Sequence, residues 1–276
     1  MSTATASPTT LKALARDMRA DIIRMISAAG NGHPGGSLSV IDLLTVLYWK
    51  FLKHDPHKPD WRDRDRLILS KGHACPALYT VMAYRGYFPK ELLMTLRKLG
   101  SPLQGHPDRL RLPGIEFSSG SLGQGLSVGL GMAISAKMDK ASWKTYVVLG
   151  DGELQEGQCW EAFMAAPKFQ LDNLVAIVDH NNGQIDGPVD QVMAIEPLAD
   201  KLRAFNWEVQ SVDGHDLAAI EKALAKAQKA GGKPHAIIAK TVKGKGVSFM
   251  EHNIAWHGNA PKKEDADKAV KEIHHG

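Results

Sequence analysis

The chain has 276 residues, of which 43% are hydrophobic and 23% charged, the balance of a large globular protein. Its formal net charge of +4 is small, so composition gives no support to a nucleic-acid-binding protein. No apolar run approaches the ~20 residues of a membrane span, and the polar start at residues 2–7 lacks the apolar centre of a secretion signal. We therefore expect a cytoplasmic protein that contacts no membrane.

Two helices are predicted at the start of the chain. The first begins at Ser7-Pro8, an N-cap followed by proline at the first helical position, and its apolar positions recur at helical spacing until Gly30. The second begins after Gly36 and keeps one apolar face as far as Phe51. His33 is therefore predicted to lie in a glycine-rich elbow between two helices.

The rest of the chain alternates between predicted strands and helices. Strands are predicted at 66–70, from 145, at 174–179, at 207–212 and at 235–240. Helices are predicted near 76–84, 89–99 and 216–230, and a small-residue helix from Gly123 to Met138 would allow close packing against a neighbour. This alternation predicts one α/β domain over residues 1–276, with a mainly parallel sheet and helices on both faces. The lysine cluster Lys243-Gly-Lys245 is expected to lie on a solvated surface.

Two predicted strands end in polar residues suited to one ligand. Gly150-Asp151-Gly152 follows one apolar strand, and Asn181-Asn182 follows the next. The glycines permit a tight turn against a phosphate, and a helix starting near Glu156 would point its free amides at that anion. Asp151 would repel a diphosphate unless a hard cation such as Mg²⁺ lay between them, and the amide oxygen of Asn181 can complete the oxygen shell. The sequence therefore indicates a site for a Mg²⁺-diphosphate.

A dinucleotide-binding turn is the main alternative for this segment. It requires G-x-G-x-x-G, but the third glycine here is Gly157, which comes too late. Asp151 would also stand where the pyrophosphate should lie. A turn with a purely structural role is the other alternative.

Gly150-Asp151-Gly152 and the pair Asn181-Asn182 together resemble the thiamine diphosphate signature. Five further segments resemble those of transketolases and follow the family's order across almost the whole chain. They are Asn31-Gly-His33-Pro-Gly-Gly-Ser37, Lys71-Gly-His73-Ala, Gly105-His106-Pro107, Ser118-Ser-Gly-Ser-Leu-Gly-Gln-Gly125 and Trp256-His257-Gly258. The resemblance implies the thiamine diphosphate-binding fold, specifically its diphosphate-binding domain.

The resemblance also assigns the cofactor and metal ligands. Mg²⁺ would be bound by the side chains of Asp151 and Asn181 and by the carbonyl of Gly183. Asn181 is preferred over Asn182 because Ile185-Asp186-Gly187 then stays in register with the family. The positions matching cofactor contacts are Gly120, Ser121, Leu122, Gly152, His73, Asn181 and His257. Ser121 departs from the family, which has proline there, so this loop is expected to be less rigid.

Catalytic roles follow from the same resemblance. His73 and His257 would lie near the diphosphate, with His257 also counted among the catalytic residues, and His33 and His106 near the reacting sugar hydroxyls. Imidazoles titrate near neutrality, so they suit proton exchange with sugar oxygens. Glu156 matches a family glutamate in a carboxylate network between subunits; an acid favoured at a helix N-terminus explains it equally well. The remaining singled-out histidines are predicted to be structural or at the surface: His54, His57, His215, His235, His252, His274 and His275.

The resemblance covers only one half of a transketolase. In that family the glutamate that activates the aminopyrimidine belongs to a second domain, in a chain more than twice this length. The implied protein is therefore the N-terminal subunit of a split transketolase, a glycolaldehyde transferase of sugar phosphates, as in the pentose phosphate pathway. A C-terminal partner chain would supply the pyrimidine pocket in an α2β2 heterotetramer, and the single chain would be inactive.

Two other functions remain open. One is a role within a related thiamine diphosphate enzyme, such as deoxyxylulose phosphate synthase or the α chain of a 2-oxo acid dehydrogenase. These enzymes generally lack the Gly105-His106-Pro107 and Trp256-His257-Gly258 segments. The other is a non-catalytic binding module of the same fold, which would have no need of the metal-binding side chains and the family histidines.

Overall fold

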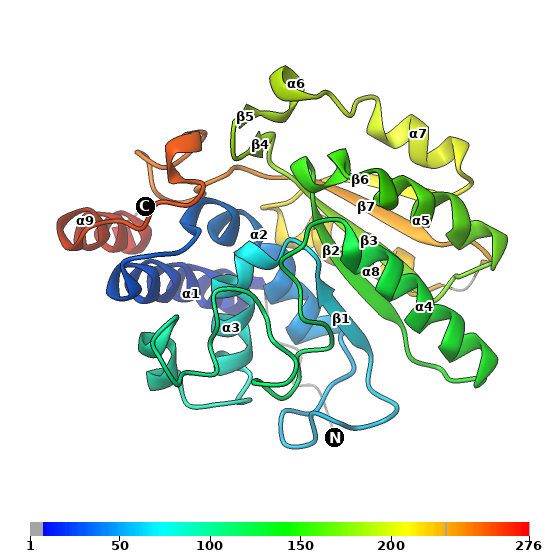
Figure 1. Cartoon of the computed structure of the whole chain (residues 1–276), viewed down its shortest axis with the longest axis horizontal. Coiled ribbons are helices and arrows are strands. Elements are labelled where there is room, and N and C mark those ends of the chain that lie inside the picture. Colours follow the sequence, from blue (N-terminus) through cyan, green and yellow to red (C-terminus); the bar gives the residue numbers. More distant parts are fainter. Residues whose placement is uncertain (1–7, 230, 276) are drawn as a thin grey trace.

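A computed structural model describes residues 8–229 and 231–275 and contains a five-stranded parallel sheet (Figure 1). The strand order is β1-β2-β3-β7-β6, with β1 at Arg66–Leu69, β2 at Thr145–Gly150, β3 at Leu174–His180, β7 at His235–Lys240 and β6 at Glu208–Asp213. A small antiparallel pair, β4 (Gly183–Gln184) and β5 (Gly187–Pro188), lies outside this sheet. Ser7, the predicted N-cap, and residue 230, the last of a predicted helix, lie outside the described residues.

The helices alternate with the strands in the second half of the chain, as predicted. Their bounds are α1 Pro8–Ala29, α2 Pro34–Val46, α3 Cys75–Tyr84, α4 Gln124–Met138, α5 Gly157–Lys168, α6 Val189–Val192, α7 Leu198–Ala204, α8 Leu217–Ala227 and α9 Lys263–His275. A π-helical turn at Leu47–Phe51 extends α2, and 3₁₀ turns lie at Gly72–Ala74, Lys90–Thr95, Gly152–Gln155 and Ile254–Trp256. None of the helices in the described ranges is both long and apolar enough to span a bilayer.

Each face of the sheet is buried under its own layer of helices. On β2, Tyr146 and Val148 belong to the hydrophobic core shared with α1, α2, α3 and α8. The alternate residues Val147 and Leu149 belong to a second core with α4, α5 and α7. Because successive strand side chains point to opposite faces, a strand buried on both sides must be apolar throughout. The predicted fold, a parallel sheet with helices on both faces, is confirmed.

Close packing of α4 against the sheet explains its small residues. A Cβ atom at Gly129 would lie 2.4 Å from Val147 Cγ2, and one at Gly125 would lie 2.4 Å from Ser70 Oγ. Neither distance is possible for a real side chain, so glycine is required where this helix crosses β1 and β2. The prediction of close packing is confirmed.

Two predicted helix boundaries are wrong. The segment 89–99 forms only the 3₁₀ turn Lys90–Thr95, because Arg97 turns the chain with a φ of 59°, which no right-handed helix contains. The second helix starts at Pro34 rather than after Gly36, since proline is tolerated in the first turn of a helix. The helix α9, which packs along α1, was not predicted from the sequence.

Candidate active site

The predicted ligand-binding residues meet at the carboxyl edge of the sheet. The last paired residues of β2 and β3 are Gly150 and Asp179, directly opposite each other. Asp151 and Asn181 therefore leave neighbouring strands at the same edge, where ligands of open parallel sheets bind. The loops after β1 and β7 reach this edge too and bring Lys71 and Lys243.

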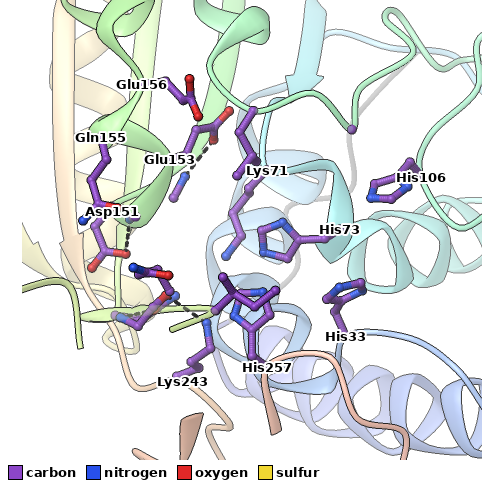
Figure 2. Close-up of a pocket in the computed structure, with 18 residues that line it drawn as sticks. His33, Lys71, His73, His106, Asp151, Glu153, Gln155, Glu156, Lys243 and His257 are labelled. Atoms are coloured by element: carbon purple, nitrogen blue, oxygen red, sulfur yellow. Dashed lines mark hydrogen bonds between the residues drawn. The ribbon is translucent and has the colours of Figure 1, made fainter. Parts of the chain in front are cut away.

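These loops line part of a cavity of about 300 Å³, and the segments that carry the histidines line the rest (Figure 2). Figure 2 shows the four histidine rings on one side of it and Asp151, Glu153 and Glu156 on the other, with the two lysines between them. The lining residues are His33, Lys71, His73, His106, Gly120, Leu122, Gly150, Asp151, Gly152, Glu153, Gln155, Glu156, Asn181, Gly183, Gln184, Ile185, Lys243 and His257. Of the predicted site residues, only Ser121, which is exposed, is not part of this lining.

The three predicted metal ligands lie together but bond to the protein's own polar groups. Asp151 accepts hydrogen bonds from the backbone amides of Asn182 at 2.5 Å and Gly152 at 2.9 Å. Asn181 Oδ1 accepts from the Gly183 amide at 3.0 Å. In the described ranges no three His, Cys, Asp or Glu side chains gather in a metal-binding group. Any cation here would depend on amide and carbonyl oxygens as well as on Asp151.

Asp151 is a buried carboxylate without a counter-ion. Its side chain forms no ion pair with any residue in the described ranges, and only 1% of the residue is exposed. Burial first, and then the nearby Asp179 carboxylate, raise the pKa of Asp151 above its usual range. A cation bound to this carboxylate would reverse that shift, so the donor set suits a hard divalent ion.

Asp179, by contrast, already has its cation. Lys71 forms a fully buried ion pair with it, and Ser39 Oγ and Asn181 Nδ2 donate hydrogen bonds to the same oxygen at 2.6 and 3.1 Å. Burial alone would raise the pKa of Asp179, but the Lys71 ammonium and the hydroxyls of Ser39 and Thr241 lower it below its usual value. The pair fixes the end of β3 and orients the Asn181 side chain.

Glu153, which lines the cavity, accepts hydrogen bonds from three separate segments. Its carboxylate accepts from the Gly123 amide at 2.9 Å and the Gly150 amide at 3.1 Å, and also from the Ser70 hydroxyl. The loop before α4 and the turn at Gly150-Asp151-Gly152 are thereby held against each other. Burial, despite these donors, raises the pKa of Glu153. Sequence reasoning gave this residue no role.

Four histidines from distant segments form one cluster. The ring centroid of His33 lies 5.2 Å from that of His73, 6.4 Å from His106 and 5.6 Å from His257. His73 and His257 are also 5.2 Å apart. Nδ1 of His33 and Nδ1 of His257 are buried and have no hydrogen-bond partner in the part of the chain that the structure describes. Such orphaned ring nitrogens are available to a polar ligand.

Burial lowers the pKa of all four imidazoles and so favours their neutral forms. Burial, followed by the charge of Arg97, lowers the pKa of His33 to about 4. Burial and then Lys243 lower the pKa of His257 to about 3. The pKa of His73 is also well below its usual value, and that of His106 is lowered, in both cases mainly by burial. Neutral rings can both donate and accept a hydrogen bond, as proton exchange with a hydroxyl requires.

Lys243 is the main site residue that the sequence did not reveal. The expected solvated surface is wrong for this lysine, which is 2% exposed. The Nζ atom donates to the carbonyl oxygen of Gly183 at 3.0 Å. Burial and then Lys71 lower its pKa to about 8. The signal that could have found it is position, because it follows the strand 235–240 as Asp151 follows its own strand.

Comparison with known proteins places this site in a family. Residues 10–275 match the family described as "Transketolase, thiamine diphosphate binding domain". The chain belongs to this transketolase family. The crystal structure of the Campylobacter jejuni transketolase superposes with a TM-score of 0.92 at 36% identity, covering 98% of this chain and 43% of that one. The chain thus spans about two fifths of the solved transketolase.

Shorter relatives match the chain over nearly their whole length. The 6-deoxy-6-sulfo-D-fructose transketolase subunit of Clostridium sp. is 48% identical over 248 residues, which is 90% of each chain. One of the apulose-4-phosphate transketolase subunits, from Phocaeicola vulgatus, is 43% identical over 264 residues, 96% of this chain and 94% of the relative. These transketolases are named as subunits, and their lengths resemble that of this chain.

Proposed function

We propose that this chain is the diphosphate-binding subunit of a two-chain transketolase, which transfers a two-carbon ketol unit from a ketose to an aldose. The observation that carries the proposal is one cavity with oxygen ligands on one side, histidines on the other and two lysines between them. The first set suits a Mg²⁺-diphosphate, and the second suits a polyhydroxylated sugar. Family membership and the named subunits support the same conclusion.

In this proposal Asp151, Asn181 and the Gly183 carbonyl hold Mg²⁺. The three supply oxygen ligands only, and the unpaired Asp151 carboxylate supplies the negative charge. The Lys243 ammonium, which now bonds to the Gly183 carbonyl, would turn to a phosphate oxygen and free that carbonyl for the metal. Glu156 lines the cavity and would join a carboxylate network between subunits.

Thiamine diphosphate would lie along the loops of Gly120 and Gly152, with His73 and His257 beside it. When bound, the thiazolium of this cofactor supplies the electron sink for cleavage of the ketose. A Cβ at Gly152 would lie 2.7 Å from Gln184 Cβ, and one at Gly120 would lie 3.2 Å from the His106 ring. The contact excludes a side chain at Gly152, and at Gly120 the φ of 149° disfavours one as well. Leu122 and the neighbouring Ser121 complete the proposed cofactor contacts.

The histidines would exchange protons with the hydroxyl groups of the sugar. His33 and His106 lie on the side of the cavity away from the proposed metal site, and their neutral rings can take a proton from a hydroxyl or return one. His257, adjacent to both His33 and His73, would contact sugar and cofactor. Each positioned acid or base contributes roughly a hundredfold or more in rate.

The partner would be a C-terminal transketolase subunit that provides the pyrimidine pocket, the activating glutamate and most substrate-phosphate contacts, in an α2β2 assembly. The relatives named for apulose-4-phosphate and 6-deoxy-6-sulfo-D-fructose suggest ketoses outside the pentose phosphate pathway. Both names describe a sugar with an anionic group. We propose an anionic ketose as donor and retain the cytoplasm as the expected location.

Reconstitution with the partner tests this function. The chain is combined with the product of a neighbouring gene that resembles the C-terminal half of transketolase, and with Mg²⁺ and thiamine diphosphate. Ketol transfer is then assayed from xylulose 5-phosphate, apulose 4-phosphate and 6-deoxy-6-sulfofructose to an aldose phosphate. Transfer that requires both chains is expected. Decarboxylation of 2-oxo acids would favour the related thiamine diphosphate enzymes, and cofactor binding without any turnover would favour a binding module.

A further inference from the structure

A buried chain of hydrogen bonds lies behind the cavity and reaches the loop that carries Lys243. Arg19 of α1 donates to both carboxylate oxygens of Asp42 of α2, at 3.2 and 2.5 Å. The ring of His215, in the loop between β6 and α8, has Nδ1 2.8 Å from Asp42 Oδ2. Its Nε2 lies 2.9 Å from the backbone nitrogen of Val242. The three side chains are only 11%, 8% and 15% exposed.

These contacts define the tautomer of His215. The Val242 amide can only donate a hydrogen bond, so Nε2 must accept and cannot carry a proton. The proton therefore lies on Nδ1, which donates it to Asp42. Arg19 bonds to both oxygens of the same carboxylate, so Asp42 is fixed in place and holds the His215 ring in this orientation.

The Val242 amide belongs to a short segment that is held at several points. The Thr241 amide donates to the carbonyl of His180 at 3.0 Å, and the Gly244 amide donates to the carbonyl of Gly35 at 3.0 Å. Between them, the amide of Val242 is held by a side chain, His215. The next residue, Lys243, turns into the cavity. The direction of its ammonium group thus depends on a backbone segment that His215 anchors.

We propose that His215, in its Nδ1-protonated form and supported by Asp42 and Arg19, is a positioning residue that fixes the Val242 amide and so aims the Lys243 ammonium at a bound diphosphate. This inference rests on the proposed function, because it assumes that the cavity binds a diphosphate. It assigns a task to a histidine that the sequence placed among the structural and surface ones.

Two substitutions separate the two bonds of the ring. The amide of Gln reaches the position of Nε2, so His215→Gln can still accept from Val242 but loses the contact with Asp42. The amide of Asn reaches only the position of Nδ1, so His215→Asn keeps the bond to Asp42 and loses the bond to Val242. Both variants lose the ring, and they differ in which hydrogen bond remains.

The main measurement is the dissociation constant of thiamine diphosphate with Mg²⁺ for the two-chain complex. We expect His215→Asn to weaken binding about two- to tenfold, the size expected of one hydrogen bond, and His215→Gln to stay within about twofold of the wild type. In a Lys243→Met background, His215→Asn should have no further effect, because its action passes through the ammonium. Equal affinities for both variants, whether normal or reduced, would overturn the proposal.

A second measurement does not require the cofactor. Ring ¹⁵N shifts of the wild-type chain should show His215 protonated on Nδ1 alone, and hydrogen exchange at the Val242 amide should accelerate in His215→Asn but not in His215→Gln. A proton on Nε2 would overturn the proposal even if both variants failed to fold. If the wild-type complex binds no thiamine diphosphate, the proposed function fails. If the wild type binds it and both His215 variants bind it equally well, only the role of His215 is rejected.

Discussion

Replacement of Lys243 by methionine should change stability and cofactor affinity in opposite directions. The methionine retains the apolar stem of the lysine and removes the buried ammonium and its bond to the Gly183 carbonyl. Without ligand, that ammonium has no carboxylate within ion-pair distance in the described ranges, and burial outweighs the attraction of the more distant Asp151 and Asp179, so its removal should stabilise the fold. With ligand, the same ammonium faces the proposed diphosphate, so its removal should weaken binding.

The magnitude follows from the pKa of Lys243, which burial and then Lys71 lower from 10.5 to about 8. This shift corresponds to about 3 kcal/mol against the charged, folded form, and the lost hydrogen bond offsets about 1 kcal/mol of the gain. At pH 7 Lys243→Met should therefore be more stable by about 1–3 kcal/mol. Because the folded pKa is the lower one, wild type recovers this stability as pH rises from about 8 to 10.5, so the difference should shrink over that range.

Urea unfolding of the cofactor-free chain at pH 7 and pH 10 measures the first effect, and titration of the two-chain complex with thiamine diphosphate measures the second. We expect affinity to fall about ten- to a hundredfold, as for a hydrogen bond from a charged group. Lys245→Met is the matched control, since Lys245 is partly exposed and pairs with Glu251 at 3.3 Å. A destabilised Lys243→Met protein with unchanged affinity would refute the reasoning.

Two further predictions concern packing and protonation. Gly129→Ala should destabilise the fold by about 1–3 kcal/mol, because its Cβ would overlap the sheet. Gly131→Ala, whose Cβ would lie in open space, should be neutral or stabilising. Urea unfolding compares the two variants, and equal stabilities would contradict the packing of α4 on the sheet. The imidazole resonances of His33 and His257 should not titrate between pH 5 and 8, and protonating these rings should lower stability as pH falls from 6.5 towards 4. NMR midpoints near 6.5 for both rings would show that the cluster is not desolvated.

Much of the site could be predicted from the sequence because its residues follow strand ends. Asp151 and Asn181 each come directly after an apolar strand, and consecutive parallel strands frequently pair, so their meeting at one edge was predictable. The actual register, with Gly150 opposite Asp179, confirms this. The separation of apolar side chains into two cores likewise follows from strands that are apolar throughout.

Other features depend on tertiary contacts that no local pattern carries. Lys243 is buried because the loop after β7 folds against Gly35 of α2, far away along the chain. The role of Glu153 likewise requires Gly123 and Ser70 to approach from separate loops. The apolar residues of segment 89–99 have helical spacing, but only Lys90–Thr95 form a helical turn because the chain reverses at Arg97. The helix propensities of these residues do not predict that turn.

The most direct test of the metal site compares wild type with Asp151→Asn in the two-chain complex. Calorimetric titration with thiamine diphosphate is carried out with Mg²⁺ and again with EDTA. We predict saturable binding by wild type only with Mg²⁺, and at least roughly a hundredfold weaker binding by Asp151→Asn. The variant should still fold, because removal of a buried charge offsets the loss of one of the two amide hydrogen bonds to this side chain. Equal affinity in EDTA, or in the variant, would contradict a cation held by Asp151 beneath the diphosphate.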